Sequence, residues 1–489
     1  MRSKPQHTTR TRPMIARGLY SLVLMILLAG CGQALPYVNE PLVTSYDNDD
    51  PHLYGIVEGM WLPELTCELG VGWERLIFNW REHQPQSPDD WVTFQIDQRW
   101  LDAAQACDRQ VVALLKDTPQ WATDGLAGVG VPSGLDLPLD DPENYWAAFV
   151  RRTVEYYAPR GVMHYIIWNE PDIDSDTYGY EFEGDLEDYF VMLKTAYLVA
   201  KEVNPDVSIH LAGTTFWHDV NEGRAPYMTR LVDRIQEDPN AAEHGYYFDV
   251  LSLHIYFRND SIPRIVGTMR AMLDDHGLHD KAIWINETNA APTDDPDWRV
   301  VRPVFQLGLD HQAAYVVQAM ALGLSAGAER IAVYKLWDQH LPEGGESFGI
   351  LHPTTQEPRP AYDAWQMVNQ HFTDVVRAQR TPTTTADVVR LTHADGTQSI
   401  LAWARTAQAT TVTVTATEQD AEIIDQYGTI TRTTPTDGRY RLSLSPALCE
   451  AGEGCFLGGE VVILRQAEGA IVVQEIVNNQ ATTLEFNEE

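Results

Sequence analysis

The chain has 489 residues, of which 44% are hydrophobic, so it is long enough to bury a large core and to form more than one domain. Its 70 acidic residues outnumber the 35 basic ones, which gives a formal net charge of -35 at pH 7. Such a surface repels phosphate backbones, so we expect no nucleic acid partner, and we expect the acidity to keep the protein soluble.

The first 30 residues are typical of an export signal. Five basic residues precede an apolar run, Gly18–Leu28, that is too short to span a bilayer as a helix. Leu28-Ala29-Gly30-Cys31 follows and resembles a bacterial lipobox, a signal in which the cysteine is lipidated and becomes the N-terminus. An ordinary secretory signal that contains a cysteine is the alternative. We predict a signal peptide over residues 1–30, a lipid on Cys31, and an exported, extracytoplasmic protein that meets the membrane only through that lipid.

Beyond a tether predicted over the polar, Pro- and Asp-rich residues 31–52, short apolar runs alternate with amphipathic segments. We predict eight strands, at residues 54–57, 75–78, 111–115, 165–168, 208–212, 250–255, 282–285 and 331–334. Predicted helices lie at residues 95–109, 142–157, 186–203, 262–273, 311–325 and 360–371. This alternation over residues 53–379 is the pattern of a TIM (β/α)8 barrel. A doubly wound sheet is the competing α/β architecture, but no Gly-rich phosphate loop opens a helix here.

The sequence pattern changes after about residue 380. Alternating runs with the period of a strand replace the helical periodicity, at residues 388–391, 411–414, 439–444 and 460–464. Turn sequences such as Asp437-Gly438 separate these runs. We therefore predict an all-β sandwich over residues 380–489 that follows the α/β barrel.

Apart from Cys31, the chain has four cysteines, an even number that suits an oxidising compartment. Cys449 and Cys455 flank a Gly-containing loop that a disulfide could close. Cys67 and Cys107 fall in the first two expected barrel helices, which would be neighbours. Buried free thiols are the alternative for both pairs. No cysteine and histidine cluster has metal-ligand spacing, so we expect no metal site.

Two of the apolar runs end in a glutamate. Trp168-Asn169-Glu170-Pro171 closes the fourth predicted strand, and Trp284-Ile285-Asn286-Glu287 closes the seventh. In a TIM barrel, catalytic groups lie at the C-terminal ends of strands, and three βα units on an eight-stranded ring place the two carboxyl groups across the mouth from each other. Two facing carboxyl groups can cleave a glycosidic bond. A solvated loop residue or a helix cap is the alternative for each glutamate.

These strand ends resemble those of the clan A glycoside hydrolases, whose acid/base follows an asparagine on strand four and whose nucleophile ends strand seven. The resemblance covers the barrel, and within the clan it points to glycoside hydrolase families 39 and 5. It implies that Glu170 is the acid/base and Glu287 the nucleophile. It also implies that Asn169 donates a hydrogen bond to the sugar 2-hydroxyl.

Other strand ends resemble the clan by position. Arg75 resembles the arginine that keeps the nucleophile ionised, while His254 and Tyr256 occupy a place where clan members put groups beside the nucleophile. Trp337 follows the eighth predicted strand, where the clan places an indole platform under the sugar. Trp121 also follows a strand end, and aromatic rings stack on the C–H faces of sugars. Packing of loops onto the barrel is the alternative role for both indoles.

We therefore predict a retaining β-glycosidase that acts on an oligo- or polysaccharide and needs no cofactor. Glu287 beside Arg75 should stay a carboxylate, and its charge should raise the pKa of Glu170 so that Glu170 can donate a proton. A transglycosylase that uses the same pair is one alternative. A non-catalytic, glycan-binding surface lipoprotein is another. A metal-dependent barrel hydrolase is disfavoured because no H-x-H ligand spacing is present.

Overall fold

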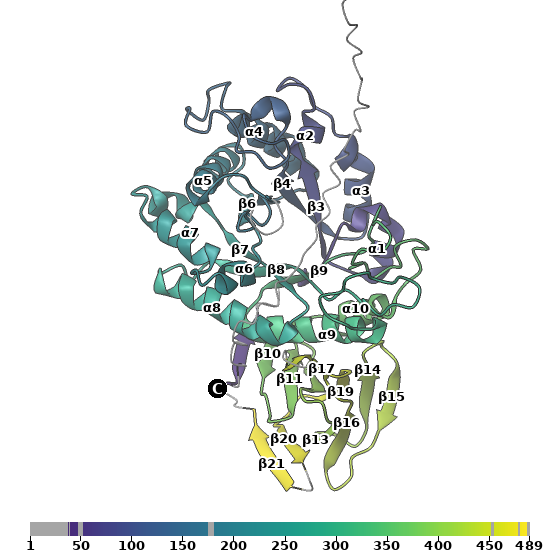
Figure 1. Ribbon diagram of the computed structural model, residues 1–489. Coiled ribbons are helices and arrows are strands. Elements are labelled where there is room, and N and C mark those ends of the chain that lie inside the picture. The colour runs from purple at the N-terminus through teal and green to yellow at the C-terminus, as the bar shows by residue number, and fades with distance from the viewer. Residues whose placement is uncertain are drawn as a thin grey trace, which may run out of the picture.

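The computed structural model describes residue 38 and residues 40–46, 52–174, 180–450, 454–477 and 480–486. The predicted signal peptide and its lipid-bearing Cys31 lie outside these residues. Within them, no helix is long and apolar enough to cross a membrane. The chain forms a barrel of strands and helices with a β-sheet domain packed below it (Figure 1).

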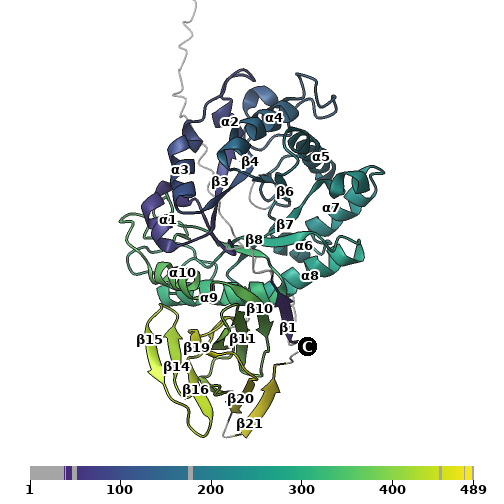
Figure 2. The ribbon, with the colours of Figure 1, turned by 180° about the vertical axis from the view of Figure 1, so that it is seen from behind.

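Eight parallel strands close the barrel, and they confirm the eight strands predicted from the sequence. They are β2 (Tyr54–Val57), β3 (Trp73–Asn79), β4 (Gln110–Lys116), β5 (His164–Ile167), β6 (Ser208–Leu211), β7 (Val250–Tyr256), β8 (Ala282–Asn289) and β9 (Arg330–Val333). The last strand pairs with the first, which completes the ring seen from behind in Figure 2. Side chains fill the ring, and Trp73 and Trp284 pack together inside it with ring centroids 5.2 Å apart.

Helices surround the strands. Six match the predicted segments: α3 (Gln98–Ala106), α4 (Tyr145–Tyr157), α5 (Leu186–Val203), α8 (Ile262–Asp275), α9 (Leu309–Ala326) and α10 (Pro360–His371). Helix α1 (Pro63–Leu69) is the helix expected around Cys67. Three were not predicted: α2 (Trp80–His83), α6 (Trp217–Asn221) and α7 (Tyr227–Gln236). Short 3-10 turns lie at Gly59–Trp61, Phe94–Ile96, Gln120–Ala122, Ala158–Arg160, Ala241–Tyr247 and Asn259–Ser261.

The start of α4 differs from the prediction. The proline at position 142 does not open the helix; instead the Asn144 side chain accepts a hydrogen bond from Ala147 N at 3.1 Å. That contact caps a free backbone N–H of the first turn, and the helix begins at Tyr145.

The C-terminal domain contains two antiparallel sheets, as predicted. The larger has the order β1-β10-β11-β12-β19-β14-β15 and the smaller β16-β13-β20-β21. Their strands are β1 (Leu42–Ser45), β10 (Val375–Arg380), β11 (Ala386–His393), β12 (Thr397–Ala404), β13 (Thr410–Thr415), β14 (Ala421–Asp425), β15 (Ile430–Thr433), β16 (Arg439–Leu444), β19 (Val462–Ala467), β20 (Val472–Val477) and β21 (Gln480–Glu485). A separate hairpin joins β17 (Leu448–Glu450) to β18 (Gly454–Leu457). The two sheets enclose an apolar core of their own.

The predicted domain boundaries need two corrections. Part of the predicted tether, β1, is an edge strand of the larger sheet, where Leu42 pairs with Arg380 and Ser45 with Arg377. The side chains of β1 alternate between half-buried and exposed, as expected of an edge strand. Its backbone pairs with the edge of β10. Because β10 itself belongs to this sheet, the second domain begins at about Val375 rather than at residue 380.

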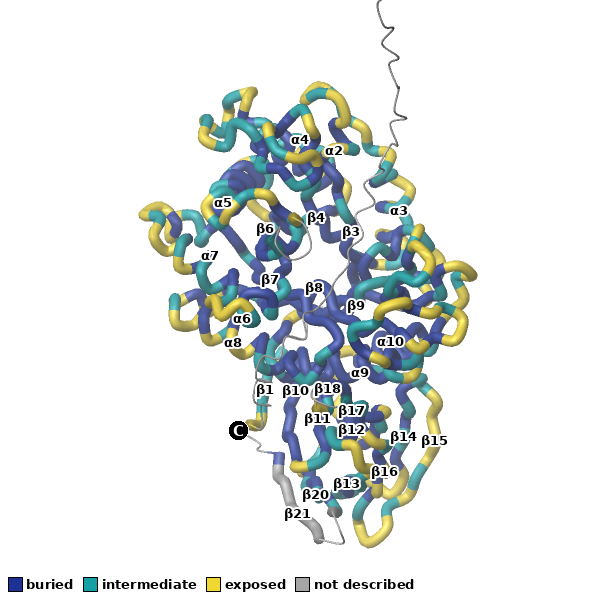
Figure 3. Tube along the Cα trace, viewed as in Figure 1, coloured by how far each residue is buried: buried dark blue, intermediate teal, exposed yellow. Residues whose placement is uncertain are grey.

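Helix α9 joins the two domains. It lies between the barrel and the sheets in Figure 1, and Figure 3 shows its trace as buried. Its sequence is apolar nearly all round, as expected of a helix covered on every side. At its C-terminal end, the Tyr46 hydroxyl donates to the Ala328 carbonyl at 2.9 Å, which ties the segment after β1 to the barrel.

Both predicted cysteine pairs are disulfide-bonded. Cys67 on α1 is joined to Cys107, which follows α3, with their Cα atoms 5.7 Å apart. Cys449 is joined to Cys455 across the β17–β18 hairpin. The first bond links neighbouring barrel helices, and the second closes a short loop of the C-terminal domain.

Candidate active site

A strained turn carries Glu170 into the mouth of the barrel. Trp168 and Glu170, which follow β5, both have positive φ angles, 69° and 41°. The Glu170 N–H donates to the Gly213 carbonyl at 3.0 Å, and the Trp168 indole donates to the Glu181 carbonyl at 2.8 Å. Such backbone persists only where its surroundings hold it, and these two hydrogen bonds help to hold it. It leaves the Glu170 side chain almost fully buried, with 1% exposure.

A β-bulge carries Glu287 to the same place. Along β8, Trp284 lies in the barrel interior and Ile285 packs toward the helices. Strict alternation would turn Glu287 toward the helices as well. However, the pairing of β7 with β8 advances by one residue on β7 and two on β8, which makes Asn286 the extra residue of a bulge. A bulge re-aims the side chains beyond it, and Glu287 therefore faces the interior.

The Glu287 carboxylate is held by groups from two other strands. The Arg75 guanidinium, from β3, forms an ion pair with it, and both side chains are buried. The Tyr256 hydroxyl, at the end of β7, donates a hydrogen bond to it. Arg75 also donates to the Asn169 side-chain oxygen at 3.3 Å, so one guanidinium joins the ends of β5 and β8.

Histidine 254 lies between the two glutamates. Its Nδ1 atom is 2.7 Å from Glu170 Oε1 and 3.5 Å from Glu287 Oε2. The Asn169 amide donates to the other oxygen of Glu170 at 3.5 Å. Each of the side chains of Glu170, His254 and Glu287 has one potential ligand atom within 4.8 Å of those of the other two. The two carboxyl groups therefore lie close together.

The surroundings push the pKa values of the two carboxyl groups apart. Burial, opposed in part by His254 and assisted by the negative charge of Glu287, raises the pKa of Glu170 to about 7. Burial would raise the pKa of Glu287 too, but Arg75, His254 and Tyr256 outweigh burial and hold it below its ordinary value. A carboxylic acid and a carboxylate are thereby placed side by side near neutral pH.

Comparisons with known proteins bear on the fold of this chain. No protein-family model matches the chain, and no curated protein sequence matches it. A family 39 glycoside hydrolase from Bacteroides cellulosilyticus WH2 has a similar structure, with a TM-score of 0.63, 16% identity, and coverage of 86% of this chain and 82% of that one. A GH39 enzyme from Xanthomonas axonopodis pv. citri matches with a TM-score of 0.53, 13% identity, and coverage of 88% and 96%.

A third similar structure is a GH30 endoxylanase from Clostridium papyrosolvens C71. It has a TM-score of 0.54 and 13% identity, and the match covers 88% of this chain and 98% of that one. At such identities these structures establish the fold. The barrel with an added β-domain is thus an architecture that known glycoside hydrolases share with this chain.

Six of the predicted site residues lie together and two do not join them. The six are Glu170, Glu287, Asn169, Arg75, His254 and Tyr256. Trp337 is half-buried and donates its indole N–H to the Pro353 carbonyl at 2.9 Å. Trp121 donates to the Gln84 carbonyl at 2.7 Å. Both contacts pack loops, and substrate binding by these two indoles stays a prediction.

The structure adds residues that were not predicted. The Tyr334 ring packs edge-on against Tyr256, with centroids 5.8 Å apart, which places a further aromatic side chain beside the glutamate cluster. Lys335 follows it and forms an ion pair with Glu58, the residue after β2. The sequence could have indicated Tyr334, Lys335 and Glu58, because each is a polar or aromatic residue at the end of a predicted strand.

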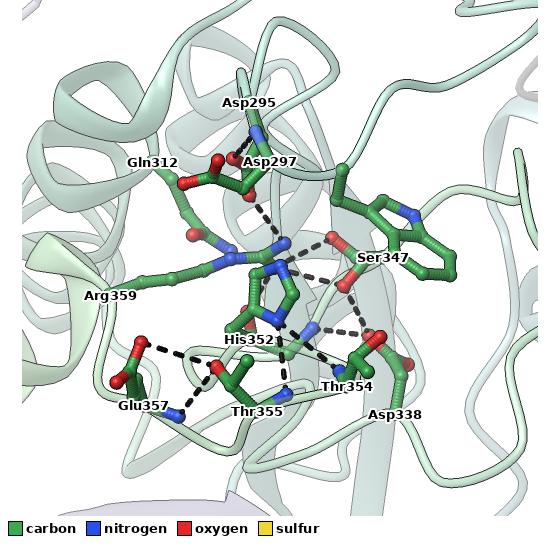
Figure 4. Close-up of polar contacts among 12 residues, drawn as sticks. Asp295, Asp297, Gln312, Asp338, Ser347, His352, Thr354, Thr355, Glu357 and Arg359 are labelled. Carbon is green, nitrogen blue, oxygen red and sulfur yellow. Dashed lines mark hydrogen bonds and ion pairs between the residues drawn. The ribbon is translucent and has the colours of Figure 1, made fainter.

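A buried arginine fixes the loop that carries these residues. Arg359 donates to Asp295 at 2.8 Å and to the Ser347 hydroxyl at 2.9 Å (Figure 4). Ser347 donates in turn to Asp338 at 2.9 Å. Asp295 belongs to the loop after β8 and the other partners to the loop after β9. The network therefore holds two neighbouring loops of the barrel mouth against each other.

Metal binding is a competing use of the glutamate cluster. Glu170, His254 and Glu287 form the one group of three potential ligands found in the part of the chain that the structure describes. However, Arg75 and Lys335 both act on the Glu287 carboxylate as positive charges, and a divalent cation would be repelled by them. The arrangement favours proton transfer and nucleophilic attack over metal binding.

Proposed function

We propose that the protein is a retaining glycosidase that hydrolyses β-glycosidic bonds in an oligo- or polysaccharide. The separation of its two carboxyl groups carries this proposal. Carboxyl groups lie about 5–5.5 Å apart in retaining enzymes and about 6.5–9.5 Å apart in inverting ones. One oxygen of Glu170 and one of Glu287 lie within 4.8 Å of each other, which leaves no room for an attacking water between Glu287 and the anomeric carbon.

In the first step, Glu287 attacks the anomeric carbon of the sugar while the glycosidic C–O bond breaks. Glu170 gives its proton to the departing oxygen, so the leaving sugar departs as a neutral alcohol. The product of this step is a glycosyl ester of Glu287. Arg75 and Tyr256 favour the ionised nucleophile before attack, because both hold its carboxylate.

In the second step, water attacks the same carbon and the ester bond breaks. Esterification removes the negative charge of Glu287, so the pKa of Glu170 falls and Glu170 can take the proton of the water. Glu287 is released as a carboxylate, and two inversions give net retention at the anomeric carbon. The same pair of charges thus supports both the acid and the base role of Glu170.

Neighbouring side chains orient the pair. His254 contacts both carboxyl groups from β7 and so fixes the direction in which the Glu170 carboxyl points. Asn169 is positioned by Arg75, and its amide can meet the sugar 2-hydroxyl, a contact that strengthens in the transition state. Tyr334 supplies an aromatic surface next to the cluster for the C–H face of the sugar.

The proposal is tested with a panel of nitrophenyl β-glycosides, led by xylosides because one similar structure is an endoxylanase. Proton NMR of the first product formed distinguishes retention from inversion. Glu346→Ala is the matched control, because this half-buried glutamate lies in a loop at the same end of the barrel. We expect the wild type to give a first product with retained anomeric configuration, and we expect Glu346→Ala to keep the wild-type activity. An inverted first product would contradict the mechanism.

We also propose that the protein is exported and anchored by a lipid on Cys31. The two disulfide bonds support an oxidising compartment. Expression of wild type and Cys31→Ser in a bacterial host, followed by fractionation, tests this. Wild type should enter the membrane fraction and incorporate labelled palmitate, and an unlabelled wild type would contradict the lipid anchor.

A further inference from the structure

The backbone immediately after Tyr256 is strained. Phe257 has a φ angle of 57°, in the left-handed region that bulky residues avoid. Its N–H donates to the Asn289 carbonyl at 2.9 Å, which ties the end of β7 to the end of β8. A residue of this kind holds its conformation only where the packing around it over-determines the backbone. The packing around the Phe257 ring is therefore part of what holds the backbone next to Tyr256.

An aromatic chain leads from Phe257 into the C-terminal domain. The Phe257 ring packs against Phe305 with centroids 5.3 Å apart and against Phe348 at 5.6 Å. Phe305, from the loop after β8, packs in turn against Phe456 at 4.6 Å. Phe456 lies on β18 and is fully buried. The last ring that supports the strained residue thus belongs to the other domain.

A second set of contacts reaches the same loop. The Asn259 amide, two residues after Phe257, donates to the Gln318 side-chain oxygen at 2.7 Å. Gln318 lies on α9, and its side chain accepts from Gly458 N at 3.0 Å and donates to the Gly459 carbonyl at 2.7 Å. All three bonds are buried. The segment Phe456–Gly459 therefore reaches the loop after β7 by two routes, through the Phe305 ring and through the hydrogen bonds of Gln318.

The hairpin that carries this segment is itself held in place. Cys449 and Cys455 are bonded across it, and the carboxylate of Glu450 accepts from Gln306 N at 3.0 Å. Gln306 is the neighbour of Phe305 in the loop after β8. In Figure 3 the hairpin lies against α9, on the side of the sheets that faces the barrel. Its position is thus fixed both within its own domain and against the barrel loop.

We propose that the segment Phe456–Gly459 of the C-terminal domain positions Tyr256, so that this domain is a working part of the active site. The inference rests on the proposed glycosidase function and assigns Phe456 as a positioning residue for it. Tyr256 touches the nucleophile directly, since its hydroxyl donates to Glu287. Phe456 acts on that hydrogen bond through Phe305 and Phe257.

Loss of the Phe456 ring has a defined consequence. Phe305 would move into the vacated space, Phe257 would relax, and the Tyr256 hydroxyl would leave Glu287. The pKa of Glu287 would then rise, and the acid limb of the kcat/KM profile would move to higher pH. The ionisable groups that face Glu287 are Arg75 from β3, Glu170 from the end of β5, His254 and Tyr256 from β7, and Tyr334 and Lys335 from β9.

The experiment compares Phe456→Ala with Leu442→Ala. Leu442 is equally buried but belongs to the separate core between the two sheets. Both variants should lose thermal stability, as large-to-small core changes do. We expect Phe456→Ala alone to lower kcat/KM about tenfold and to move its acid limb upward by about half a pH unit or more. Phe456→Leu should restore most of the lost activity.

An unchanged kcat/KM and pH profile in a folded Phe456→Ala protein would overturn the inference, as would equal changes in Leu442→Ala. If Phe456→Ala does not fold, Gln318→Leu removes the hydrogen-bonded route instead, with the same profile expected.

A fluorine NMR measurement works without activity. The protein is labelled with 3-fluorotyrosine, and the Tyr256 resonance is assigned by its loss in Tyr256→Phe. This resonance should shift in Phe456→Ala and not in Leu442→Ala. An inactive wild type would overturn the proposed function. The Tyr256 resonance would still test the coupling between the domains, because a resonance that does not shift in Phe456→Ala would overturn that coupling.

Discussion

The strand ends that carry Glu170 and Glu287 bring a carboxyl group to the same place by different backbone devices. After β5, two residues with positive φ angles form a strained turn. In β8, one extra residue forms a bulge that reverses the alternation of side chains. The turn coincides with a recognisable sequence motif, whereas the bulge does not. Two groups of one chemical type are thus made unequal by their surroundings, and each prediction below tests that inequality.

The largest expected effect belongs to Glu287→Ala. Because this carboxylate forms the covalent intermediate, its loss should lower kcat/KM by about 10⁴-fold or more with every substrate, whatever its leaving group. Steady-state kinetics on an activated nitrophenyl glycoside and an unactivated disaccharide measure it. A Glu287→Ala variant that keeps more than a tenth of the wild-type rate would contradict the role of Glu287 as nucleophile.

Glu170→Ala should show a loss that depends on the leaving group. Proton donation typically contributes about 10²–10⁴-fold, and an activated leaving group needs little of it. We expect a severe loss on the disaccharide and a much smaller one in the first step with a dinitrophenyl glycoside. A uniform loss with all substrates would contradict the role of Glu170 as acid and would make the two glutamates alike.

Thermal stability should respond to pH in opposite directions for the two groups. The folded pKa of Glu170 is raised to about 7, so its contribution to stability is present below its unfolded pKa and is lost as the pH rises toward 7. Glu170→Gln should therefore raise the thermal midpoint more at pH 8 than at pH 5.

The folded pKa of Glu287 is lowered, so its contribution is present above its unfolded pKa and is lost as the pH falls through the folded value. Glu287→Gln should lower the midpoint at pH 7, where Arg75 loses its partner, and less at the acid end. Calorimetric scans from pH 4 to pH 8 measure both variants. Parallel pH dependences would contradict the separation of the two pKa values.

A smaller effect is expected from Asn286→Ala. Both polar atoms of this buried amide lack a hydrogen-bond partner, so the bulge depends on the extra backbone residue and not on the amide. Removal of an unsatisfied polar group offsets part of the cavity that alanine leaves. We expect kcat/KM within about threefold of wild type. A loss as large as that of Glu287→Ala would show that the amide itself aims the nucleophile.

The smallest effect is expected from metal removal. Dialysis against a chelator, followed by assay with and without added Mg²⁺, Zn²⁺ or Ca²⁺, should leave kcat unchanged, since Arg75 already pairs with Glu287. Loss of activity that a particular cation restores would contradict the two-carboxylate mechanism.

Much of the fold and both glutamates of the proposed catalytic pair could be predicted from the sequence. The barrel strands were visible because each is a continuous apolar run between amphipathic helices. Glu170 was visible through its motif, whereas the strained turn that carries it was not predicted. By contrast, α2 has only four residues, too few to show a helical period. Strand β1 is short and half-exposed, and its partner β10 lies more than 300 residues further along the chain.

The remaining features depend on contacts between distant segments. The bulge at Asn286 follows from how β8 pairs with its neighbours, and no turn residue at that position signals it. The support of Phe257 by Phe456 spans two domains and depends on their docking. Residues such as Lys335 and Glu58 were overlooked although each directly follows a predicted strand. Local periodicity thus predicts elements, whereas packing decides which side chains meet.

Azide rescue tests the inequality of the two glutamates most directly. Azide can replace the missing nucleophile in Glu287→Ala, or react with the glycosyl ester in Glu170→Ala, and proton NMR gives the anomeric form of each glycosyl azide. We predict the α-azide from Glu287→Ala and the β-azide from Glu170→Ala, when a β-glycoside is the substrate. The same anomer from both variants, or the reverse assignment, would contradict the roles that we give to Glu170 and Glu287.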